Sequence, residues 1–355
     1  MIESRNDVLV ARYEKSWVGG PDHSQVPAHA RILHGGRFRD RFMPSVRERQ
    51  PRVETGNFLY GGPLKVHFGH IMVDSIIRLW AFDPVRHDQV VFAKLQETRG
   101  ITDWISEILS LFGVKQEHVR LVNGVAAFER MEFAEPGSRL ASGPSAAHLD
   151  YLDGLPLSRT TGTPKKVYFG RTHMIAKGTI LGESHWAAAL ESNGYTCVVP
   201  ERMTIHEQTS VLRNAESVVF LEGSSIYSIE LLSKIAAPVF MIPRRAATGH
   251  LFAPHIAPRT SFTVLGDPET IVRRLTAKGA GGPSSPSYSL NPEDLHDDMV
   301  AKGLIRGSFS MSAYREAERA DAATYFASQP EIGEAQLADI EQVRAGQGAR
   351  TISTR

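Results

Sequence analysis

Short apolar runs alternate with helical patterns through the middle of the chain. Five runs each predict a strand, at residues 165–170, 195–199, 217–221, 238–242 and 262–265. Helical patterns separate them, at residues 183–192, 204–214 and 224–234, and a last helix is expected to start at Asp267. Because the strands are apolar throughout, both faces of their sheet should be covered, which indicates a parallel, Rossmann-like sheet.

The first block of the chain carries a weaker version of the same alternation. Residues 89–93 and 118–122 have strand patterns, and residues 102–112 form an amphipathic helical pattern. A further helix is expected from about His70 to Ala81. These elements predict a second α/β domain.

Two turn-rich stretches divide the chain, at residues 135–146 and, with more glycine, serine and proline, at residues 279–287. The expected parts are an N-terminal α/β domain at 1–155, a Rossmann-like domain at 160–280 and a helical tail at 288–355. Helical patterns of the tail lie near 294–302, 313–327 and 334–345. Two α/β domains would leave a cleft between them, and ligands of such sheets bind beyond the carboxyl ends of the strands.

Composition limits the classes of function. The 40 Lys and Arg residues against 39 Asp and Glu leave a net charge of +1, so no overall field draws the chain to nucleic acid or to an anionic membrane. Cys197 is the single cysteine, which excludes an internal disulfide and fits a reducing compartment. We find no secretory signal pattern and no run of about 20 apolar residues. We therefore expect a cytoplasmic protein without a transmembrane segment; peripheral association with a membrane stays open.

Polar residues follow the predicted strand at 217–221. The run Glu222-Gly223-Ser224-Ser225 leads into a helix, whose unpaired N–H groups and partial positive charge suit a phosphate. An ordinary serine N-cap is the alternative. Glu230, one to two turns into this helix, is expected to face a ribose or solvent.

Two neighbouring strand ends also carry polar residues. Arg171 follows the strand at 165–170, where it can bind a pyrophosphate with two parallel hydrogen bonds or form a surface salt bridge with Glu183 or Glu201. Glu201 itself follows the strand at 195–199. Because three consecutive strand ends are polar, we favour a nucleotide-type ligand.

A second candidate group lies in the first block. His70, Asp74 and Arg78 are spaced four residues apart and so share one helix face. A His and an Asp in contact can act as a general base and its orienting partner, and a solvated face with an Asp74–Arg78 ion pair is the alternative. His67 and His70 have the spacing of metal ligands, but no third ligand accompanies them, so we expect no metal site.

Several fingerprints of other enzyme classes are absent. No Gly-x-Gly-x-x-Gly follows a strand, which disfavours a dinucleotide-dependent oxidoreductase, and no Walker A motif or Gly-x-Ser-x-Gly elbow occurs. The Asp-x-Asp pair, which many metal-dependent sugar transferases use, is also missing.

The ordered set of these residues resembles glycosyltransferase family 61. The matching pieces are Gly69-His70, Asp74, Arg78, the strand that ends in Arg171, Gly194-Tyr195, Pro200-Glu201, Glu207-Gln208, Asn214-Ala215 and Gly223. The resemblance covers residues 65–235 and is strongest over 165–235. It implies a GT-B architecture, in which two Rossmann-like domains face each other across a cleft.

The resemblance also implies an activity. The C-terminal domain would bind a nucleotide-diphosphate sugar, commonly a UDP-sugar, as substrate, and the N-terminal domain would bind a glycan acceptor. Transfer of the hexosyl or pentosyl group would be inverting and would need neither a metal nor a separate cofactor, in agreement with the missing Asp-x-Asp. Polysaccharide biosynthesis is the expected setting.

Roles are implied by position. Arg171 and the Gly223–Ser225 turn would hold the diphosphate, and Glu201 and Gln208 would line or support the nucleotide pocket. His70 and Asp74 would face the cleft from the acceptor side, where either could deprotonate the attacking hydroxyl.

The sequence departs from the family pattern in two places. Its turn reads Glu222-Gly223-Ser224-Ser225-Ile226 where the family usually has His-Gly-Ala-Gly-Leu, and Gly182 stands where an Asn often precedes the position of Glu183. An ionised Glu222 pointing at a diphosphate would be unfavourable; it could turn away, bind ribose, or mark a different donor or lost activity. A non-catalytic member that binds a nucleotide or sugar is therefore one alternative, and a nucleotide-dependent α/β oxidoreductase is another.

Overall fold

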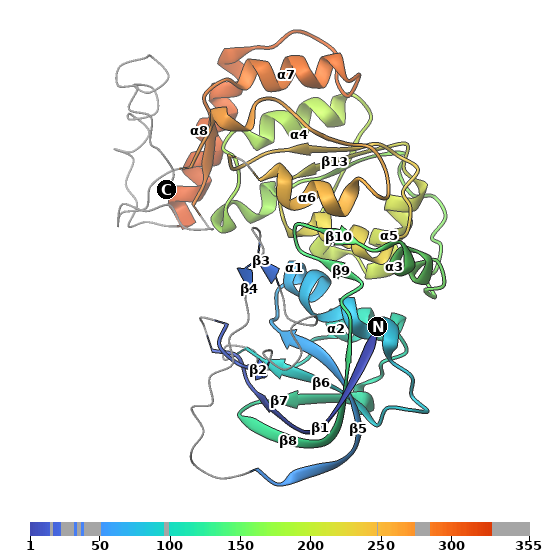
Figure 1. The fold of residues 1–355 in the computed structure, drawn as a ribbon. Coiled ribbons are helices and arrows are strands. Elements are labelled where there is room, and N and C mark those ends of the chain that lie inside the picture. Colours follow the sequence, from blue (N-terminus) through green and yellow to red (C-terminus); the bar gives the residue numbers. More distant parts are fainter. Residues whose placement is uncertain are drawn as a thin grey trace.

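Two β-sheets, one above the other in Figure 1, form the frame of this computed structural model. The structure describes residues 1–14, 17–22, 32–33, 37–38, 51–95, 99–246, 248–273 and 285–328. The fold is mixed α/β, as the sequence predicts. We call the first sheet with helices α1 and α2 the N-terminal lobe, and the second sheet with helices α4 to α8 the C-terminal lobe.

The sheet of the N-terminal lobe is mixed rather than purely parallel. Its strands are β1 (Ile2–Ala11), β2 (Gly20–Pro21), β5 (Val53–Leu64), β6 (Gln89–Lys94), β7 (Val119–Val122) and β8 (Val125–Ala134), in the order β2-β1-β8-β5-β6-β7. The pairs β8–β5, β5–β6 and β6–β7 are parallel, whereas β1 runs antiparallel to both β8 and β2. The strands predicted at 89–93 and 118–122 are confirmed, but the long strands β1, β5 and β8 were not predicted.

The sheet of the C-terminal lobe is entirely parallel, as predicted. Its strands are β11 (Lys166–Phe169), β12 (Thr196–Val198), β13 (Ser217–Leu221), β14 (Val239–Ile242) and β15 (Phe262–Val264), in the order β12-β11-β13-β14-β15. The chain passes from β11 outward to β12 and then returns to the other side of β11. The direction of the connections therefore reverses between β11 and β13.

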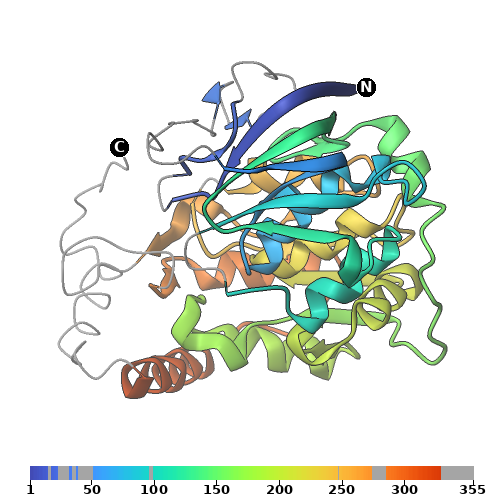
Figure 2. The same cartoon turned by 90° about the horizontal axis from the view of Figure 1, so that it is seen from below.

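Most predicted helices are present. The α-helices are α1 (Phe68–His70), α2 (Asp103–Leu111), α3 (Ala146–Leu152), α4 (Glu183–Ser192), α5 (Ile205–Asn214), α6 (Gly249–Ile256), α7 (Pro292–Ala301) and α8 (Met311–Ser328). Thr204 and Glu207 form the predicted capping box at the start of α5, with the Glu207 amide donating to the Thr204 hydroxyl at 3.1 Å. Helix α8 lies at the edge of the molecule in both views (Figure 1 and Figure 2). None of the described helices is long and apolar enough to span a membrane.

Three helix predictions need correction. The segment Ser224–Leu231 (η7) is a 3₁₀ helix, and the helix expected at Asp267 is one 3₁₀ turn, Pro268–Thr270 (η8), that leads into strand β16 (Ile271–Arg273). The helix expected from His70 changes type twice, from α1 to a π-helical turn η2 (Ile71–Ser75) and then to a 3₁₀ helix η3 (Ile76–Ala81). Helix α6 was not predicted. The remaining turns and short strands are β3 (Ile32–Leu33), β4 (Arg37–Phe38), β17 (Ser287–Ser289), η4 (Gln116–His118), η5 (Thr172–Lys177) and η6 (Pro200–Arg202).

The stretch predicted as a linker at 135–146 is a structured hairpin. Strands β9 (Ser138–Arg139) and β10 (Gly143–Pro144) pair with each other, and the amide of Ala141 between them donates to His255 Nε2 of α6 at 3.2 Å. Most of the second predicted linker and the helix predicted at 334–345 lie outside the described residues. The domain boundaries stay predictions.

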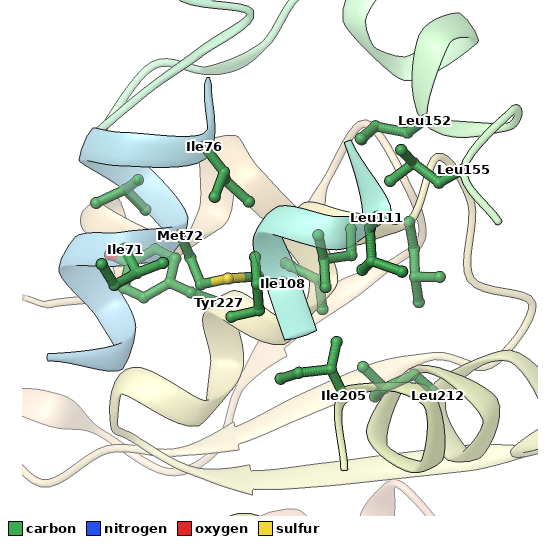
Figure 3. Packing of buried hydrophobic residues seen from close by; sticks show 14 of the residues in the cluster. Ile71, Met72, Ile76, Ile108, Leu111, Leu152, Leu155, Ile205, Leu212 and Tyr227 are labelled. Carbon is green, nitrogen blue, oxygen red and sulfur yellow. The ribbon is translucent and has the colours of Figure 1, made fainter. Parts of the chain in front are cut away.

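One hydrophobic core runs through both lobes. Figure 3 shows Ile71 and Met72 of the N-terminal lobe beside Tyr227 of η7, with Ile76 further along the same segment. It also shows Ile108 and Leu111 of α2 above Ile205 and Leu212 of α5. Met72, Ile108 and Leu212 are fully buried. Side chains therefore fill the junction between the lobes along this line, and any ligand site must lie beside it.

Candidate active site

The main predicted site residues lie at the junction of the two lobes, just beyond the ends of strands from both sheets. Arg171 follows β11 and Gly223 follows β13, so they flank the reversal of the C-terminal sheet, which is where ligands of open α/β sheets bind. His70 follows β5, next to the corresponding reversal between β5 and β8. Helix α1 packs against η7 closely enough that a methyl group on Gly69 would lie 3.2 Å from Ser224 Cβ. The two candidate groups therefore meet across the lobe junction.

Arg171 lies against the Gly223 turn. Its Nε donates to the carbonyl oxygen of Gly178 at 3.2 Å and its Nη2 to that of Lys177 at 3.3 Å, while Nη1 would be 3.0 Å from a methyl group on Gly223. The residue is 8% exposed, and burial lowers the pKa of its guanidinium against the opposing effect of nearby carboxylates. Within the described residues it forms no ion pair, so the expected alternative of a surface salt bridge is wrong.

The loop that carries Arg171 is anchored from two sides. Glu183 is buried and accepts hydrogen bonds from the Arg171 amide, the Thr179 hydroxyl and, at 3.1 Å, the Tyr168 hydroxyl. Burial raises the pKa of Glu183. The Gly182 amide donates at 2.9 Å to Asp321 of α8, which caps α4 from 139 residues away.

This cap explains one departure from the family pattern. Gly182 has a φ of +89°, a conformation that favours glycine, and a side chain there would collide with Tyr314 of α8. The carboxylate of Asp321 thus stands in for the side-chain cap that an Asn would give, because it also accepts from the Ser184 amide at 3.3 Å.

The second departure, Glu222, points inward. Its side chain is fully buried, its Oε2 accepts from the Arg244 amide at 2.9 Å, and its Oε1 forms an ion pair with Arg245. Glu222 therefore does not turn away towards solvent, and its carboxylate is paired within the protein. Arg245 was not among the predicted site residues, although it follows β14 at the same sheet edge and could have been found there.

The turn after Glu222 has backbone N–H groups and serine hydroxyls that no side chain caps. Gly223 is the N-cap of η7, in an extended conformation, and no side chain caps this helix, so the expected serine N-cap is wrong. The hydroxyls of Ser224 and Ser225 are half-buried and make no hydrogen bond within the described part of the chain. The first N–H groups of η7 and two free hydroxyls are therefore available to an anion.

His70 and Asp74 form the predicted dyad. His70 Nδ1 and Asp74 Oδ2 are 2.7 Å apart, the His70 side chain is 21% exposed, and that of Asp74 is 4% exposed. Arg78 is buried and donates to the Asp74 carbonyl oxygen at 3.0 Å, so the alternative of a solvated face is wrong. Gly62 of β5 permits this packing, since a side chain there would lie 2.7 Å from the Asp74 carbonyl oxygen.

Aromatic and basic groups surround His70. The ring of Trp17, which the sequence analysis did not single out, lies 5.1 Å from the His70 ring, and Lys65 Nζ lies 5.6 Å from the Trp17 ring. The pKa of His67 falls to about 4, mainly through burial and then through the charges of His70, Lys65 and Arg171. That influence puts Arg171 within electrostatic reach of the helix that bears the dyad. No group of three His, Cys, Asp or Glu among the described residues could hold a metal ion.

Glu201 and Gln208 support the next strand end. Gln208 Nε2 donates to the carbonyl oxygens of Pro200 at 2.9 Å and Met203 at 3.3 Å, which fixes the turn that bears Glu201. Glu201 is half-exposed and its Oε2 lies 2.9 Å from His173 Nε2. Gln208 therefore supports the turn, and contact of either residue with a nucleotide stays a prediction.

Glu230 does not face a ribose or solvent, contrary to the sequence-based expectation. It is 1% exposed, with Oε1 2.8 Å from His255 Nδ1 and 3.4 Å from Arg259 Nη1. These partners lower its pKa to about 2 despite its burial. Glu230 belongs to a buried network beneath the site.

The chain matches one family model. Residues 68–234 match the model of the family described as Glycosyltransferase 61, which nearly coincides with the range of the resemblance found in the sequence. The predicted family is confirmed. No curated protein matches the chain.

Proposed function

Residues 68–234 match the model of glycosyltransferase family 61, and on that premise we propose that the chain transfers a sugar from a nucleotide-diphosphate donor, a UDP-sugar in the first instance, to a glycan hydroxyl. The C-terminal lobe binds the donor and the N-terminal lobe the acceptor, in the manner of a GT-B enzyme. One observation carries the proposal: Arg171 and the Gly223 turn flank the reversal of a parallel sheet, and a His–Asp dyad lies on the opposite lobe.

The dyad suggests how the acceptor is activated. His70 is the more exposed partner, and its Nδ1 is engaged by Asp74, so Nε2 is the nitrogen available to take the proton of the acceptor hydroxyl. Asp74 orients the ring and stabilises the imidazolium that forms. The acceptor oxygen then bonds to the anomeric carbon as the bond from that carbon to the diphosphate oxygen breaks, which inverts the configuration without a metal.

The leaving group is stabilised from the other lobe. Charge grows on the diphosphate as it departs, and Arg171 and the first N–H groups of η7 are preorganised to meet it. Because the guanidinium is held by two carbonyl oxygens, it needs no rearrangement at that moment. The polysaccharide setting, the cytoplasmic location and the lack of a separate cofactor stay predictions.

The experiment is a donor assay on the purified full chain. A panel of nucleotide sugars is screened for hydrolysis and for transfer, and Arg171→Ala is compared with Arg130→Ala. Arg130 is an exposed residue of β8 paired in register with Asn57, near the start of β5, at the opposite end of that strand from His70. Loss of one preorganised donor of this type costs about a hundredfold or more in turnover. Turnover by Arg171→Ala within a few-fold of the wild type would refute the assigned role, and binding of a donor without turnover would support a non-catalytic family member.

A further inference from the structure

A buried ion pair occupies the place where the family pattern has a histidine. Glu222 is fully buried, and both the Nε and the Nη2 of Arg245 contact its Oε1. The Arg244 amide donates to its Oε2, and the Arg244 Nε donates to its backbone carbonyl oxygen at 2.9 Å. The carboxylate is therefore fully engaged, and its negative charge is neutralised within the protein.

Glu222 holds one edge of the Arg245 guanidinium, at Nε and Nη2, and leaves Nη1 for another partner. The Arg245 side chain is 27% exposed, and Nη1 makes no hydrogen bond within the part of the chain that the structure describes. A guanidinium has five N–H donors in one plane, so a contact that fixes one edge also fixes the direction of the remaining donors. Glu222 thus orients Arg245 at the edge of the sheet next to Gly223.

Arg245 lies on the other side of the Gly223 turn from Arg171. Arg245 follows β14 and Arg171 follows β11, and these are the strands on either side of β13. The charge of Arg245 lowers the pKa of Arg171, which places the two cations within electrostatic reach of each other. Two neighbouring guanidinium groups repel each other, and a dianion between them relieves that repulsion.

We propose that Arg245, positioned by Glu222, is a second residue that binds the diphosphate of the donor. This inference rests on the proposed function and extends it to a residue outside the family pattern. The Arg245 guanidinium is then a permanent cation where a histidine would be cationic only when protonated, although its pairing with Glu222 leaves the two residues without net charge. Glu222 is a positioning residue in this arrangement and does not itself touch the ligand.

The test compares binding of nucleoside diphosphates with binding of their nucleosides. The diphosphate that the wild type binds tightest among UDP, GDP, CDP and ADP is titrated calorimetrically into Arg245→Ala, Arg245→Lys and Arg130→Ala. We expect Arg245→Ala to weaken diphosphate binding at least tenfold, Arg245→Lys to weaken it less, and Arg130→Ala to leave it unchanged. Affinity for the matching nucleoside should stay within twofold in all three, which a general loss of structure would not allow.

Glu222 is tested by rescue. Glu222→Ala should weaken diphosphate binding as Arg245→Ala does, whereas Glu222→Gln keeps an acceptor for Arg245 and should restore most of the affinity. Because both residues act through one contact, the double variant should bind no more weakly than Arg245→Ala alone. Wild-type diphosphate affinity in Arg245→Ala overturns this inference and leaves the proposed function intact. A wild type that binds none of the four diphosphates and hydrolyses no nucleotide sugar refutes both.

Discussion

The buried network around Glu230 offers a quantitative test of the folded structure. Glu230, His255 and Arg259 are each at most 3% exposed, and the carboxylate contacts both partners. Replacing Glu230 by Gln keeps the shape and removes the charge, which leaves Arg259 buried without its counterion. Breaking a buried pair in this way typically costs about 3–5 kcal/mol.

The pKa of Glu230 gives a second measure of the same energy. Its fall from the ordinary value of 4.5 to about 2 corresponds to about 3 kcal/mol of stability. Because the pKa is lower in the folded state, this stability is fully present above the unfolded pKa and is lost as pH falls towards 2. About half of it should be gone at pH 3.

Urea unfolding followed by circular dichroism at pH 7 and pH 3 measures both effects. Glu230→Gln should be about 3 kcal/mol less stable than the wild type at pH 7, and the gap should shrink by about half at pH 3. The matched control is Glu117→Gln, an exposed carboxylate whose loss should change the free energy of unfolding by less than about 0.5 kcal/mol. A gap under 1 kcal/mol at pH 7, or one that does not change with pH, would contradict the reasoning.

Two further predictions concern the dyad and the core. Asp74→Asn should lower kcat for sugar transfer by about a hundredfold while affinity for the donor diphosphate stays within twofold, because the residue acts on the acceptor side; an equal loss in donor binding would count against that assignment. Met72→Ala removes a fully buried side chain at the lobe junction and should lower the free energy of unfolding by about 2–5 kcal/mol, measured by urea titration. Exposed Met311→Ala is its control, and an equal effect of the two substitutions would mean that the junction is not packed as described.

The sequence predicted the C-terminal sheet well because its signals are local. Continuous apolar strands, a capping box at Thr204 and short connections fix the alternation without help from distant residues. Strand β5 was missed because it contains Gly61, Gly62 and Pro63, which normally mark a turn; in the structure they accompany an irregular register between β5 and β6. The residues of η7 from Ile226 to Leu231 are all buried, so the sequence has no polar face whose period could distinguish a 3₁₀ helix from an α-helix.

The part of the candidate site that lies at strand ends or on one helix face could be predicted from the sequence. Arg171, Gly223 and the His70–Asp74 pair could be named because each follows a legible strand or shares one helix face. The partner of Glu222 could not be deduced, since pairing with Arg245 depends on which strands are neighbours. The capping of α4 by Asp321 could not be predicted either, because Asp321 lies in a helix 139 residues after Gly182.

The continuous core at the lobe junction restricts how substrates come and go. A clamshell motion would peel η7 and α5 away from the π-helical turn and α2, and would wet side chains such as Met72, Tyr227 and Leu212. Exposing three such groups costs about 5–9 kcal/mol, which thermal fluctuation rarely supplies within a catalytic cycle. The proposed donor and acceptor would therefore have to reach the site while the two lobes stay in contact along this core.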